Sequence, residues 1–121
     1  MSNYEIFVIG SQDQYEEMVK LGEYQKSCLK DVYPNSVITV TIAETGCEPD
    51  MKEARDINEE REIPSRQKRR VIKKNLKNIS KSNLVLALEK EDGWFDMSTT
   101  YLMAFAEFLG KCLIPVKANS F

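Results

Sequence analysis

The sequence predicts an α/β protein with a small flavodoxin-like or Rossmann-like parallel sheet of four to five strands and helices on both faces. Short runs of apolar and β-branched residues alternate along the chain with longer segments of helical periodicity. One run, at residues 83–89, is apolar at nearly every position, which is typical of a central parallel strand covered on both sides. Strands that alternate with helices are joined by right-handed crossovers, so the strands run parallel.

The first half of the chain predicts two strands around one helix. Residues 4–9, "YEIFVI", are rich in aromatic and β-branched residues and end at Gly10-Ser11, as a buried strand does. Apolar residues then recur at helical spacing from 12 to 31, which predicts an amphipathic helix. A Pro-Asn-Ser break precedes residues 37–42, "VITVTI", a second strand by its β-branched content.

The next part of the chain predicts two helices before the apolar strand. Residues 50–62 are polar and only weakly amphipathic, and we expect them to be helical. Pro64 separates them from a helix at 65–80, for which Ser65 is an N-cap candidate and whose apolar stripe includes Leu76.

The last part predicts a loop, a helix and a final strand. The acidic loop "KEDGWFD" leads to an apolar helix over residues 97–109. Gly110 stands where a helix commonly ends in a left-handed residue. The segment "CLIPV" at 112–116 is the last strand.

Length and composition predict a single domain over residues 1–121 in the cytoplasm. The chain is 42% hydrophobic and 30% charged, as in ordinary soluble proteins. No apolar run approaches the ~20 residues of a membrane span, and the N-terminus lacks the basic region of a signal peptide.

The histidine and cysteine content restricts the chemistry. The chain has no histidine, which excludes a Ser-His or Cys-His nucleophile pair and the usual histidine metal sites. Its three cysteines are widely spaced, and we expect Cys28 and Cys112 to be buried thiols. We predict neither a metal nor a cofactor.

A basic segment interrupts this acidic protein. Residues 61–82 hold nine Lys and Arg against one Glu, although the whole chain has a net charge of −2. Such a segment can contact phosphates, face solvent, or form a subunit interface with an acidic surface such as the 50–62 segment of a second copy.

Three stretches of the chain carry a family resemblance: "IFVIGS", "NLKNISKSNLVLAL" and "DMSTTYLMAFAEFLGKCLI". Together they resemble the nucleoside 2-deoxyribosyltransferase superfamily, which includes the 2′-deoxynucleoside 5′-phosphate N-glycosidases. The resemblance follows the element order of nearly the whole chain, but its sharp motifs cover about a third of it. Gly10 and Ser11 match the loop beside the base and sugar, and Asp96 and Thr99 match the Asp and Thr of the later motif.

The departures from the family pattern fall on its catalytic residues. Leu102 occupies the position of the Glu that attacks the anomeric carbon. Asn75 and Asn83 replace the two Asp residues, and Ser98 replaces a Gly. Covalent cleavage of an N-glycosidic bond requires a carboxylate, and leucine has neither charge nor lone pair. Enzymatic activity is therefore uncertain, and the resemblance implies a binding protein without a catalytic residue.

The function that follows is that of a catalytically degenerate nucleoside- or nucleotide-binding protein, a pseudoenzyme that forms a homodimer or larger homo-oligomer. Asn75 and Asn83 would hydrogen-bond a base or ribose, and Ser98 and Thr99 would hold a phosphate at a helix N-terminus. The candidate ligand-binding residues are Gly10, Ser11, Asn75, Asn83, Asp96, Ser98 and Thr99.

Two other functions stay open. One is an active deoxyribosyltransferase or nucleotide N-glycosidase with a relocated nucleophile. The other is an interaction protein that uses the basic helix on nucleic acid or an acidic partner. Asp96 could equally be the N-cap of the helix that follows it. Trp94, Phe95 and Tyr101 could stack on a base or pack in the core or an interface.

Overall fold

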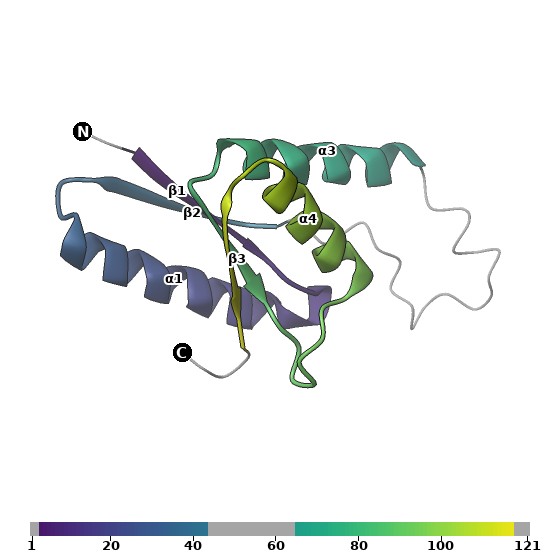
Figure 1. The fold of residues 1–121 in the computed structure, drawn as a ribbon, viewed down its shortest axis with the longest axis horizontal. Helices are drawn as coiled ribbons and strands as arrows, with labels where there is room; N and C mark the ends of the chain where they lie inside the picture. Colours follow the sequence, from purple (N-terminus) through teal and green to yellow (C-terminus); the bar gives the residue numbers. More distant parts are fainter. Residues whose placement is uncertain (1–2, 44–64, 118–121) are drawn as a thin grey trace.

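The structure, a computed structural model, describes residues 3–43 and 65–117 (Figure 1). Its four strands are β1 (Asn3–Ile9), β2 (Val37–Ile42), β3 (Leu84–Leu88) and β4 (Cys112–Val116). Its helices are the 3₁₀ turn η1 (Gln12–Gln14), α1 (Tyr15–Val32), α3 (Ser65–Lys81) and α4 (Met97–Phe108). The predicted helix at 50–62 lies outside the described residues.

The strands form one parallel sheet in the order β2-β1-β3-β4, which confirms the predicted fold class. The chain moves from β1 outward to β2, then crosses back over β1 to β3. The strand order therefore reverses between β1 and β3. In open parallel sheets this reversal opens a crevice at the carboxyl ends of the two strands.

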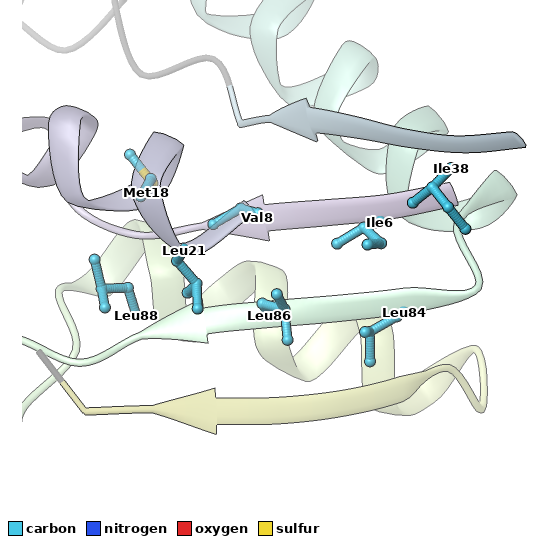
Figure 2. Close-up of a cluster of buried hydrophobic side chains, with 8 residues drawn as sticks. All are labelled: Ile6, Val8, Met18, Leu21, Ile38, Leu84, Leu86 and Leu88. Carbon is cyan, nitrogen blue, oxygen red and sulfur yellow. The ribbon is translucent and has the colours of Figure 1, made fainter. Parts of the chain in front are cut away.

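Alternating side chains of the strands build a core on each face of the sheet, because successive residues of a strand point to opposite sides. On one face, α1 places Met18 and Leu21 over Val8, Leu86 and Leu88 (Figure 2). That cluster comprises Ile6, Val8, Met18, Leu21, Ile38, Leu84, Leu86 and Leu88.

Helices α3 and α4 cover the opposite face, where Phe7, Ile9, Val85 and Ala87 alternate with the residues of the first cluster (Figure 1). The second cluster comprises Phe7, Ile9, Ala43, Ile79, Val85, Ala87, Leu102 and Ala106. Since β3 contributes to both clusters, all five of its residues are buried. This confirms the prediction of a central strand covered on both sides.

Two thiols differ from the prediction. Cys28 and Cys112 are both exposed, so the expectation that they are buried is wrong. Cys28 lies in the second half of α1, where no residue is buried. Cys112 opens β4, an edge strand in which no residue is fully buried.

Gly110 ends α4 as predicted. Its φ of 70° lies in the left-handed region that favours glycine. Its N–H donates to the Glu107 carbonyl, and the Lys111 N–H donates to the Ala106 carbonyl. These two bonds form a Schellman motif, which satisfies carbonyls that the helix end would otherwise leave unpaired. No helix in the described part of the chain is both long and apolar enough to cross a membrane.

Candidate functional site

A network of hydrogen bonds ties the carboxyl ends of β1 and β3 together. Gln14 is buried, and its Nε2 donates to the Glu89 carbonyl at 2.9 Å. Its Oε1 accepts from the Ser11 hydroxyl at 2.9 Å and from the Ser11 N–H at 3.3 Å. Gln14 therefore bridges the loop after β1 and the loop after β3, across the point where the strand order reverses.

Gln14 was not among the residues predicted from sequence. The signal was present, because Ser11 and Gln14 have the Ser-x-x-Gln spacing of a capping box at a helix start. Ser11 is itself buried, and its one hydroxyl proton is shared between Asp13 and Gln14. The Ser11 side chain therefore stabilises the conformation of the loop.

Gly10 is closely packed beneath the loop. A Cβ at this position would lie 2.9 Å from the Met18 sulfur and 3.4 Å from Leu88 Cβ. The absent side chain lets the loop lie directly on α1 and β3.

Asp13 and Lys90 bring opposite charges to this edge of the sheet. The hydrogen bond from the Ser11 hydroxyl, followed by the Lys90 charge, lowers the pKa of Asp13, although partial desolvation opposes them. Asp13 is exposed, so its carboxylate is accessible from solvent.

Replacing Ser11 with alanine removes the larger of these two causes. We expect the pKa of Asp13 in Ser11→Ala to rise toward its ordinary value, because a hydrogen bond to the charged form favours that form. A ¹³C NMR titration of the Asp13 carboxyl carbon measures this shift. Lys90→Met serves as the matched comparison and should raise the same pKa by less. An Asp13 titration that is unchanged in Ser11→Ala would contradict the assignment.

The N-terminus of α4 lies at the same edge of the sheet, since α4 follows the loop that leaves β3. Asp96 is its N-cap, and one carboxylate oxygen accepts from the Thr99 N–H at 2.8 Å. Ser98 is exposed in the first turn, whereas Thr99 is 1% exposed. The Thr99 hydroxyl points into the protein and makes no hydrogen bond. The Thr99 side chain is therefore part of the interior, and its backbone N–H already donates to Asp96, so this geometry does not support the predicted role of Thr99 in holding a phosphate.

We expect the N-cap of α4, Asp96, to stabilise the folded protein. We expect Asp96→Ala to lose about 1 kcal/mol of unfolding free energy, because the Thr99 N–H loses its acceptor. Chemical denaturation measures the loss. Asp96→Asn keeps an acceptor oxygen and should lose much less. Equal losses in the two variants would show that charge, and not the hydrogen bond, is the cause.

The two asparagines of the predicted site do not lie together at this edge. Asn83 immediately precedes β3, and its Oδ1 accepts from the Glu5 N–H at 2.8 Å. It stands at the amino end of the sheet, so grouping it with Gly10 and Ser11 is wrong. Asn75 is buried on the inner face of α3, in line with Val71 and Ile79 at spacings of four residues.

Leu102, at the position where the resembling family has its nucleophile, is a core residue. It is 8% exposed and packs in the cluster that contains Phe7, Ile9 and Ala106.

The aromatic residues proposed for stacking separate into two groups. Phe95 packs against the second core cluster. Trp94 and Tyr101 are 72% and 57% exposed. Among the described residues, no group of three His, Cys, Asp or Glu is arranged to hold a metal ion.

Comparison with known proteins shows a likeness to solved structures and none to a protein family. No protein-family model matches the sequence, and no curated protein matches it. Among solved structures, the chain is similar to a 2-desoxiribosyltransferase from Leishmania mexicana, with 16% sequence identity and a TM-score of 0.48. The match covers 94% of this chain and 64% of the Leishmania chain. The activity in that name is a property of the Leishmania protein.

Proposed function

We propose that this protein binds a nucleoside or nucleotide at the carboxyl end of its sheet and does not cleave the glycosidic bond. The observation that carries the proposal is the polar edge between β1 and β3, where the strand order reverses. Ligands of open parallel sheets bind at such reversals. Gln14 holds the two loops of this edge in place.

The charges at this edge favour particular parts of the ligand. Lys90 is a cation there, and it suits a phosphate. Asp96 has a carboxylate that suits a sugar hydroxyl, because it accepts hydrogen bonds and repels phosphate. Ser98 is exposed in the first turn of α4, whose N-terminus lies at the same edge of the sheet. We therefore expect a nucleoside monophosphate with its phosphate toward Lys90 and its sugar toward Asp96.

The absence of cleavage rests on Leu102. Glycosidic bond cleavage by a covalent route requires a carboxylate beside the anomeric carbon. Leu102 is packed among apolar side chains on the sheet, and neither its chemistry nor its position serves that role.

A thermal-shift screen with nucleosides, nucleoside monophosphates and free bases tests binding. A ligand at about 100 times its dissociation constant adds about 2.7 kcal/mol to the free energy of unfolding. We expect monophosphates to raise the melting temperature by several degrees. Lys90→Glu should lose this response and keep the response to nucleosides. Lys26→Glu, the same charge change on α1, should keep both. A flat screen would end the proposal.

Turnover is tested separately by chromatography of deoxynucleosides and their monophosphates incubated with the protein. We expect no free base above a heat-inactivated control. Release of base would instead support the alternative of an active enzyme with a relocated nucleophile.

A second function is favoured by the basic helix. On α3 the side chains of Arg70, Lys73, Lys74, Lys77 and Lys81 are exposed. They recur every three or four residues and so share one face. A surface of this kind binds polyanions, and such binding weakens steeply as salt rises. Fluorescence anisotropy with a labelled oligonucleotide at two salt concentrations measures this. Binding that does not change with salt would exclude it.

A further inference from the structure

Helix α4 presents an apolar stripe to solvent on the side opposite the sheet. Its buried residues Thr99, Leu102 and Ala106 define the inner face. On the opposite face, Met97 is 89% exposed, Tyr101 57% and Phe108 84%. Ala104 is exposed between them. At 3.6 residues per turn, these four side chains fall within about 60° of one another around the helix.

This face is unusual for a surface helix. Glu107 is the one charged residue in the sequence of α4. A helix that is apolar on all sides is normally covered on all sides. By contrast, the outer face of α3, which packs beside α4, is densely basic. The exposed stripe (Met97, Tyr101, Ala104 and Phe108) is therefore a surface that a partner would bury.

We propose that a second copy of this chain covers the stripe, with the two α4 helices antiparallel about a twofold axis. The spacing of the four residues is four, three and four, which reads the same in both directions. A twofold axis midway between Tyr101 and Ala104 places each Tyr101 over the partner's Ala104. The same axis places each Met97 against the partner's Phe108.

The sizes and chemistry of these pairs are complementary. At the centre, the large ring of Tyr101 lies opposite the methyl group of Ala104, and this pairing lets the two helices approach closely. A thioether lies against an aromatic ring at each end, and this is a favourable contact. A twofold contact uses the same patch on both copies, so a patch must be complementary to itself, as this one is.

Charge complementarity supports the antiparallel direction. Glu91 and Asp92 lie in the loop that precedes α4, at the carboxyl edge of the sheet. Lys81 and Lys111 lie at the opposite edge, because they precede β3 and β4, whose first residues Leu84 and Cys112 are register partners. An antiparallel pair brings the acidic loop of one copy beside these lysines of the other. A parallel pair would place acid beside acid.

Sedimentation velocity across a range of protein concentrations tests the dimer. We expect the wild-type chain to dimerise, and Met97→Glu or Phe108→Lys alone to lower the association constant about tenfold or more. Tyr24→Lys replaces an aromatic residue on α1 that is 55% exposed, close to the 57% of Tyr101, and it should leave association unchanged. Circular dichroism confirms that each variant is folded. Met97 and Phe108 are both highly exposed, so their replacement spares the core.

The double variant Met97→Glu with Phe108→Lys tests the direction of the pair. In the antiparallel arrangement each introduced glutamate faces an introduced lysine of the other copy, so association recovers at low salt relative to either single variant. A wild-type chain that stays monomeric would overturn the proposal. So would a dimer that both single variants leave intact, or a double variant that does not recover.

Discussion

Leu102→Glu, which installs a carboxylate at the position where the resembling superfamily has its nucleophile, is expected to destabilise the protein and to create no glycosidase activity. Leu102 lies in the second core cluster against the sheet. A buried charge without a partner costs about 3–5 kcal/mol of unfolding free energy. Chemical denaturation of the variant beside wild type measures the loss, and chromatography of incubated deoxynucleotides measures base release.

The destabilisation should depend on pH in a defined direction. Burial raises the pKa of the new carboxyl group in the folded state above its unfolded value of about 4.3. The penalty is therefore smallest below pH ~4.3, where both states are protonated, and it grows as the pH rises through the folded pKa. Leu102→Gln has a similar size but no charge, so its loss should stay constant over the same range. A Glu variant as stable as wild type at pH 7, or one that releases base, would show that Leu102 faces a cleft.

Gly22→Ala is expected to destabilise the protein, although alanine is the better helix former by up to about 1 kcal/mol. Gly22 is buried in the middle of α1, and a Cβ there would lie 2.5 Å from a Val40 methyl group. The branched side chain of Val40 stands on a strand and has little freedom to move away. Overpacking of this kind costs about 1–3 kcal/mol, so we expect the net change to be a loss.

The double variant Gly22→Ala with Val40→Ala provides the control. Val40→Ala alone removes apolar contacts and should lower the free energy of unfolding. Because it also removes the methyl group that a Cβ at position 22 would meet, the two losses should be less than additive. Strict additivity in denaturation experiments would contradict the close approach of α1 to β2.

The strands and helix ends were predictable from sequence because they depend on local chemistry. The β-branched run at 37–42 and the final run at 112–116 match β2 and β4 residue for residue. Gly110 ends α4 because the left-handed conformation disfavours other residues. The alternation of strands and helices was also enough to predict a parallel sheet, since strands joined by helical crossovers run parallel.

The predictions that failed concern burial and position, which depend on how the strands and helices pack and not on the local sequence. Cysteine is often buried, but Cys112 stands at the start of an edge strand, and sequence does not say which strand is at the edge. Asn83 was grouped with the site through the resemblance, yet it immediately precedes β3 and thus lies at the amino end of the sheet. The apolar pattern of α4 predicted a helix but not which side faces the sheet, because apolar residues stand on two opposite sides of it.

The sequence predicted that the candidate site lies at the carboxyl edge of the sheet, but it did not predict which side chains there are accessible to a ligand. The loop after β1 was expected to line a ligand site, and it lies where the strand order reverses. Within it, however, Gly10 and Ser11 serve packing and hydrogen bonding of the loop itself. The accessible charges of Asp13 and Lys90 come together only through the contact of two distant loops.

The most direct test of the central claim is a ¹H–¹⁵N NMR titration of the protein with deoxynucleoside monophosphates. We predict saturable shifts confined to backbone amides at the carboxyl edge, in the loop after β1, at Lys90 and at Ser98. Amides of β2 and of the outer face of α3 should not move. Saturable shifts centred on α3, or no shifts at millimolar ligand, would contradict a nucleotide site at this edge of the sheet.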